Sequence, residues 1–160
     1  MEPTWGKTLV IANPAAQSGR GREGAIEVER ALKAGAAPVA SWEVRLTTRR
    51  NEAAEIAAQA GEYNTVLVLG GDGVIHEAVN GLMRLDENAR PRLGVLPLGS
   101  GNDFARTLGV VSRNKPADAL RELANSGAER TFDLGFVSSD AEPAGTWFMQ
   151  TLSFGLDAAI

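Results

Sequence analysis

Apolar and polar residues follow two periods along the chain, one typical of strands and one typical of helices. Runs of apolar, β-favouring residues predict strands at 8–12, 65–69 and 92–96, and apolar–polar alternation predicts a half-buried strand at 39–47. Apolar positions three or four residues apart predict helices at 25–32, 52–60, 74–83, 103–108 and about 116–126. Because strands alternate with helices, we expect an α/β fold with a doubly wound parallel sheet.

The pattern changes after Gly127. Two strand-like segments, 131–138 and 146–154, follow each other with no helix between them. We therefore expect residues 1–128 to form the α/β domain and residues 129–160 to begin an incomplete all-β domain. Strands without partners expose their edges, so the residues after about Phe132 are expected to be poorly ordered or swapped, or to form a homodimer by pairing with a second copy.

A glycine-rich turn follows the most apolar of the predicted strands. Gly70, Gly71 and Gly73 surround Asp72 immediately before the predicted helix 74–83. A turn of this kind directs free backbone N–H groups and the positive end of a helix at one point, which favours phosphate binding. Glycines also let a ligand approach the backbone closely. Asp72 is then expected to hold a metal that accompanies phosphate or to handle a proton. The alternative is a βα turn with a capping aspartate.

A second glycine turn, Gly99-Ser100-Gly101, follows the strand predicted at 92–96. In open α/β sheets, ligands bind beyond the carboxyl ends of the strands. Two such turns at one edge of the sheet favour a single site for a polyanion. Asn102 and Asp103 either belong to this site or cap the helix that follows.

Composition excludes several classes of function. The net charge of −4 argues against a general nucleic-acid binder. The absence of cysteine excludes disulfides, iron–sulfur clusters and thiolate chemistry, and a single histidine excludes a site with several histidine ligands. Residues 1–7 lack the apolar core of a signal peptide, and no apolar run approaches the length of about 20 residues that spans a membrane. We expect a cytoplasmic protein, with which this composition is compatible.

Four stretches resemble the diacylglycerol kinase catalytic-domain family, which includes bacterial lipid kinases, ceramide kinases and sphingosine kinases. They are Asn13-Pro14 with Ser18-Gly19, Thr47-Thr48 before an alanine-rich helix, Gly70–Gly73 with Glu77, Asn80 and Gly81, and Pro97–Ala105. The last two are long, and their order and spacing are specific. Asp133-Leu134-Gly135 and the segment 153–157 resemble the opening strands of the family's second domain.

The resemblance implies an ATP-dependent lipid kinase with a nucleotide-binding α/β domain, a β-sandwich lipid-binding domain and an active site between them. The implied cofactors are ATP and Mg²⁺, and the implied acceptor is a lipid alcohol such as diacylglycerol. The implied enzyme makes peripheral contact with a membrane surface. Arg45, Arg49 and Arg50 form a small basic cluster that is either simply solvated or contacts an anionic membrane surface. Since the family's remaining magnesium ligands and candidate base fall after Ile160, the chain alone is expected to transfer phosphate poorly.

Site residues follow from this resemblance together with the two turns. Nucleotide contacts are implied at Asn13, Ser18, Thr47, Gly70, Gly71, Asp72, Gly73, Glu77 and Ser100, and the second turn adds Gly99, Gly101 and Asn102. Asp72 and Asp103 match acids with catalytic roles, and Asp133 matches an acid linked to magnesium.

Two further interpretations stay open. NAD kinases also carry a Gly-Gly-Asp-Gly turn with a downstream acid, although they resemble this chain less at Asn13-Pro14 and at 99–104. A third interpretation is a regulatory module that binds a nucleotide without catalysis. Phosphorylation assays with diacylglycerol and with NAD would separate the first two, and ATP binding without either activity would favour the third.

Overall fold

The computed structural model describes residues 4–150 of the 160. Its parallel strands are β1 (Gly6–Ala12), β2 (Val39–Leu46), β3 (Thr65–Gly70) and β4 (Arg92–Pro97). Its α-helices are α1 (Ala16–Lys33), α2 (Glu52–Ala57), α3 (Asp72–Leu82), α4 (Asp103–Thr107) and α5 (Pro116–Ser126). Two 3₁₀ helices, η1 (Ala60–Glu62) and η2 (Glu87–Ala89), and two short strands, β5 (Gly135–Val137) and β6 (Thr146–Phe148), complete the described part of the chain.

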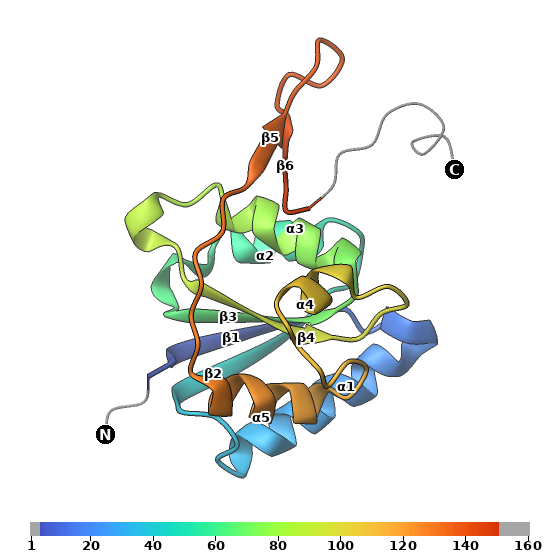
Figure 1. The fold of residues 1–160 in the computed structure, drawn as a ribbon. Helices are drawn as coiled ribbons and strands as arrows, with labels where there is room; N and C mark the ends of the chain where they lie inside the picture. The colour runs from blue at the N-terminus through green and yellow to red at the C-terminus, as the bar shows by residue number, and fades with distance from the viewer. Residues whose placement is uncertain (1–3, 151–160) are drawn as a thin grey trace.

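The central sheet has four strands in the order β2-β1-β3-β4, and every neighbouring pair is parallel. Helices α1 and α5 cover one face of the sheet, and α2 and α3 cover the other (Figure 1). This arrangement confirms the predicted α/β fold with a doubly wound parallel sheet. Parallel neighbours require crossover connections, and the helices supply them.

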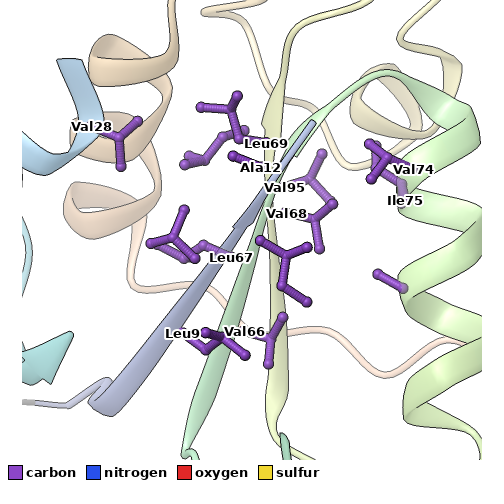
Figure 2. Packing of buried hydrophobic residues seen from close by; sticks show 14 of the residues in the cluster. Leu9, Ala12, Val28, Val66, Leu67, Val68, Leu69, Val74, Ile75 and Val95 are labelled. Carbon is purple, nitrogen blue, oxygen red and sulfur yellow. The ribbon is translucent and has the colours of Figure 1, made fainter. Parts of the chain in front are cut away.

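The core is centred on β3, whose six residues are all buried. Alternate side chains of this strand point to opposite faces of the sheet. Leu67 and Leu69 lie on the side of α1, whereas Val66 and Val68 lie on the side of α3 (Figure 2). A strand packed between two helical layers needs apolar residues at every position, which explains the unbroken apolar run in the sequence.

Helix α1 begins well before the predicted range 25–32, and its first residues are interrupted by a kink. Gln17, Ser18 and Gly19 have non-helical, left-handed backbone angles, after which the helix continues to Lys33. Gly21 serves a packing role in this segment. A Cβ atom at Gly21 would overlap the carbonyl group of Asn13, so only glycine lets the helix pass the end of β1 this closely.

Helix α2 is shorter than predicted and ends at Ala57 instead of residue 60, with η1 following it. Its backbone packs directly against α3. A Cβ atom at Gly81 would overlap the carbonyl oxygen of Ala54, so the glycine allows the two helices to approach. Asn51 is the N-cap residue of α2, and its side chain makes no capping hydrogen bond.

The segment after α5 forms a small antiparallel hairpin. In it, β5 pairs with β6 through Gly135↔Phe148, Phe136↔Trp147 and Val137↔Thr146. The predicted strand at 131–138 is therefore too long, because residues 131–133 are exposed and no strand between residues 4 and 150 pairs with them. Of the predicted strand 146–154, residues 151–154 lie outside the described part, as does the matched segment 153–157. Between residues 4 and 150, no helix has the length and apolarity needed to cross a membrane.

Candidate functional site

The direction of the strand order reverses between β1 and β3. These neighbours lead into α1 and α3, which lie on opposite faces of the sheet (Figure 1). Where successive connections leave a parallel sheet on opposite faces, the loops diverge at the carboxyl ends of the strands and leave room for a ligand. The loop after β1 and the two glycine turns after β3 and β4 all lie at this edge of the sheet.

The first glycine turn, Gly70–Gly73, leaves the N–H groups at the start of α3 without hydrogen-bond partners inside the helix. Gly70 has a φ of +154°, a backbone conformation that L side chains rarely adopt, and Gly71 is the N-cap of the helix. The first N–H groups of an α-helix have no partner within the helix and carry its positive dipole end. A Cβ atom at Gly73 would meet no described atom within 4 Å. The start of α3 therefore fits an anionic group.

The two glycine turns touch each other through their backbones. A Cβ atom placed on Gly99 would lie 2.6 Å from the Cα atom of Gly71, and one placed on Gly71 would lie 3.3 Å from the Cα atom of Gly99. The carbonyl oxygen of Gly70 also accepts a hydrogen bond of 2.8 Å from the N–H group of Leu98. The two turns thus form one continuous surface at the edge of the sheet.

Asp72 joins the two turns with its side chain. Its Oδ2 atom accepts the N–H group of Asp103 and its Oδ1 atom accepts the N–H group of Phe104, both at 3.1 Å. The carboxylate therefore caps α4 from the turn that precedes α3. Since this carboxylate occupies the two N–H groups, the start of α3 is the more available seat for a phosphate group.

The residues of the second turn divide into exposed and buried positions. Ser100 is exposed, and a Cβ atom at Gly101 would lie 3.0 Å from Oδ2 of Asp72. Asp103 is exposed and its Oδ1 atom pairs with Arg106 at 2.9 Å. Asn102 does not cap α4 with its side chain, contrary to one of the two predicted roles.

Asn102 is buried and faces the interior of the second turn, with 2% of its surface exposed. Its Nδ2 atom donates to the carbonyl oxygen of Gly99 at 2.9 Å and to Oδ1 of Asn114 at 3.2 Å. Oδ1 of Asn114 also accepts the N–H group of Gly99 at 3.0 Å, and Nε2 of Gln17 donates to the carbonyl oxygen of Gly99 at 2.9 Å. These amides hold the turn in place. Sequence reasoning missed Gln17 and Asn114, because nothing local to either residue points to Gly99.

The loop after β1 carries the predicted residues Asn13 and Ser18. Asn13 donates its N–H group to the carbonyl oxygen of Leu69 at 3.0 Å, and its Oδ1 atom accepts the N–H group of Ala15 at 3.0 Å. Ser18 is exposed and has a φ of 58°. Backbone conformations of this kind are uncommon outside glycine and cluster at functional sites. The structure therefore brings Asn13 beside β3 and leaves Ser18 at the surface of the same edge.

Thr47 lies at the end of β2 and is buried, with its N–H group bonded to the carbonyl oxygen of Ala12 at 2.9 Å. The turn that follows is closed by Glu52, whose carboxylate accepts the N–H group and the hydroxyl group of Thr48 and the N–H group of Arg49. The hydrogen bond from the backbone of Thr48 is the largest influence that holds the pKa of Glu52 below its ordinary value.

This lowered pKa predicts a pH dependence of stability. A carboxyl group whose pKa is lower in the folded state stabilises the fold above its unfolded pKa of about 4.3, and this contribution disappears as the pH falls through the folded value. We expect Glu52→Gln to lower the melting temperature at pH 7, with a difference from the unsubstituted chain that shrinks below about pH 4. Melting curves across this pH range test the prediction, and a difference that is independent of pH would contradict it.

Two predicted residues remain, Glu77 and Asp133. Glu77 is half-buried on α3, and Asp133 is exposed in the segment before β5. The ring of Phe132, next to Asp133, packs edge-on against Phe104 of α4 with 6.2 Å between ring centroids. Between residues 4 and 150, no three His, Cys, Asp or Glu side chains gather as a metal site. Magnesium binding at Asp133 stays a prediction.

Comparison with known proteins gives one consistent result. The family model described as the diacylglycerol kinase catalytic domain matches residues 7–137. A probable lipid kinase YegS-like from Chromohalobacter salexigens is 39% identical over 119 residues, which are 73% of this chain and 35% of that protein. A diacylglycerol kinase from Bacillus subtilis is 42% identical over 97 residues, which are 58% of this chain and 30% of that protein.

A solved structure agrees with these matches. The putative diacylglycerol kinase from Bacillus anthracis str. Sterne superimposes with a TM-score of 0.63 and 30% sequence identity, and the match covers 76% of this chain and 39% of that one. The matched part of the chain spans about a third of the length of the two curated relatives, 35% and 30%. The family model matches most of the chain, and the matched residues include both glycine turns and all of the four-stranded sheet except Gly6. The chain therefore belongs to the diacylglycerol kinase catalytic domain family.

Proposed function

We propose that this chain is the ATP-binding part of a lipid kinase that transfers the γ-phosphoryl group of ATP to a lipid hydroxyl, such as that of diacylglycerol. The observation that carries the proposal is the joint surface of the two glycine turns at the carboxyl edge of the sheet, in a chain of this family. Location in the cytoplasm with contact at a membrane surface belongs to the same proposal.

The described residues fit a nucleotide with its phosphates at the start of α3. Gly70, with its φ of +154°, lets the chain turn from β3 into α3, and the space above Gly73 is free of described atoms within 4 Å. Ser100, Ser18 and the open N–H groups of α3 supply donors of the kind that bind phosphate oxygens. These groups would hold the phosphates in a fixed position, which is the main requirement of phosphoryl transfer.

Asp72 would act from a fixed position, because both of its oxygen atoms are anchored by backbone N–H groups. A carboxylate oxygen keeps a further lone pair after accepting one hydrogen bond, so Asp72 can still bind a cation. Mg²⁺ prefers oxygen ligands such as the carboxylate of Asp72. The carboxylates of Asp103 and Asp133 would join it if a ligand brings them close. When bound with ATP, Mg²⁺ supplies neutralisation of the phosphate charge.

Phosphorylation assays on the complete protein that contains this chain test the proposal. We expect radiolabel from the γ-phosphate of ATP to appear in diacylglycerol or another lipid alcohol, and none in NAD. Calorimetry on the 160-residue chain should show binding of ATP with Mg²⁺ present. Transfer to NAD alone would overturn the lipid acceptor, and ATP binding without transfer to any acceptor would favour a regulatory module.

A further inference from the structure

The hairpin of β5 and β6 is attached to α3 by the side chain of Asn80. The Oδ1 atom of Asn80 accepts the N–H group of Trp147 at 2.9 Å, and its Nδ2 atom donates to the carbonyl oxygen of Trp147 at 3.0 Å. Oδ1 also accepts the hydroxyl group of Thr146 at 3.1 Å, and Nδ2 also donates to the carbonyl oxygen of His76 at 3.0 Å. Asn80 thus holds both its own helix and the strand.

This pairing imitates a neighbouring strand. In an antiparallel ladder, a residue of one strand both donates to and accepts from a single residue of the next. Asn80 offers the same donor and acceptor to Trp147, whose other neighbour across the hairpin is Phe136. The side chain therefore occupies the edge of β6 that a further strand would otherwise use. These hydrogen bonds can form only when α3 and β6 lie in this relative position.

Two further contacts tie the same segment to α4. Nε2 of Gln150 donates to the hydroxyl group of Thr107 at 2.7 Å, and Phe132 packs against Phe104. The segment after α5 therefore contacts both helices that begin at the glycine turns. Asn80 lies eight residues after Asp72 on α3, a distance of about 12 Å along the axis at the rise of an α-helix. Because a helix is stiff over this length, the position of the hairpin is fixed relative to the first turn.

We infer that Asn80 is a positioning residue, which sets the position of the β5–β6 hairpin relative to the helix that presents the first glycine turn. This inference rests on the proposed function only in its consequence for catalysis. If the lipid alcohol binds next to the β5–β6 hairpin, the hydrogen bonds between Asn80 and Trp147 determine where the acceptor hydroxyl lies relative to the phosphates. It contributes nothing to the binding of ATP.

The test compares Asn80→Ala with Thr146→Val in the complete protein. Asn80→Ala removes both bonds to Trp147, whereas Thr146→Val keeps them and removes only the hydroxyl group that donates to Asn80. We expect hydrogen exchange at the amide of Trp147 to accelerate at least about tenfold in Asn80→Ala and to change little in Thr146→Val. The Kd for ATP should stay within about twofold of the unsubstituted value, because the glycine turns are intact.

Transfer to the lipid at saturating ATP is expected to slow at least about tenfold in Asn80→Ala, since misplacing a reacting group by about 1 Å can cost 100-fold. Equal exchange at Trp147 in Asn80→Ala and the unsubstituted protein would overturn the inference. So would a joint loss of ATP affinity and transfer, which would give Asn80 a role in the stability of α3. The exchange and ATP measurements need no lipid kinase activity. They therefore test whether Asn80 positions the hairpin, even if the assays with diacylglycerol and NAD contradict the proposed function.

Discussion

Replacing Asp72 with alanine is expected to lower phosphoryl transfer by about 100-fold or more, which is the usual cost of removing one electrostatic group from an active site. The variant should also lose the cap of α4, because the N–H groups of Asp103 and Phe104 lose their acceptor. A lost cap costs about 0.5–2 kcal/mol of unfolding free energy. Transfer rates measured below the melting transition, beside denaturant unfolding curves, give the two effects separately.

A matched control for this substitution is Asp118→Ala. Asp118, like Asp72, is an acid in the first turn of a helix, but it is exposed and its carboxylate pairs with Arg121 of its own helix at 3.1 Å. Exposed ion pairs contribute little, so this variant should keep both stability and transfer rate. If Asp72→Ala loses stability but transfers phosphate at the unsubstituted rate, capping is the whole role of Asp72. The catalytic assignment would then be wrong.

Gly99→Ala is expected to cost about 1–3 kcal/mol of unfolding free energy, the range of an overpacked interior. The added Cβ atom would lie 2.6 Å from the Cα atom of Gly71 and 2.9 Å from Oδ1 of Asn102. Because the first of these is a backbone atom, a change of side-chain rotamer cannot relieve the contact. The two turns must separate, and ATP affinity should fall together with the melting temperature.

Gly73→Ala separates the effect on the ligand from the effect on the fold. Gly73 lies in the first turn of α3, where a Cβ atom would meet no described atom within 4 Å. Alanine is the better helix former by up to about 1 kcal/mol, so this variant should be no less stable than the unsubstituted chain. Its methyl group would occupy the proposed approach of the phosphates, and calorimetry should show weaker binding of ATP. Unchanged binding would mean that the start of α3 does not hold the phosphates.

Local patterns predicted the central elements of the fold well. The runs at 65–69 and 92–96 differ from β3 and β4 by one residue at the carboxyl end. A strand buried on both faces of a sheet needs apolar side chains at every position, so the apolar run itself identifies the strand. The start of α1 was missed because Gly21 reads locally as a loop residue. Its real constraint is the carbonyl group of Asn13, which comes close only in the folded chain.

The candidate site shows the same division. The glycine turns could be located from the sequence, since glycines between a buried strand and the start of a helix are typical of a phosphate-binding turn. The cap that Asp72 makes on α4 could not be predicted from the sequence, because the capped residues lie 31 and 32 positions later. The bond between Asn80 and Trp147 spans 67 positions and joins a helix to a strand. No periodicity or spacing rule connects residues so far apart, although Asn80 itself lies in one of the stretches that resemble the family.

The backbone contact between Gly71 and Gly99 also limits how this site can be transplanted. A protein engineer who grafts residues 70–73 onto another parallel sheet would transfer a loop whose shape depends on a neighbour in the adjacent loop. The smallest transferable unit is the pair of strands β3 and β4 with both of their turns and the start of α4, which the carboxylate of Asp72 links to the first turn. An insertion of one residue in either turn would move the glycines out of register with each other. The lengths of the two loops are therefore expected to change together among proteins that share this site, or not at all.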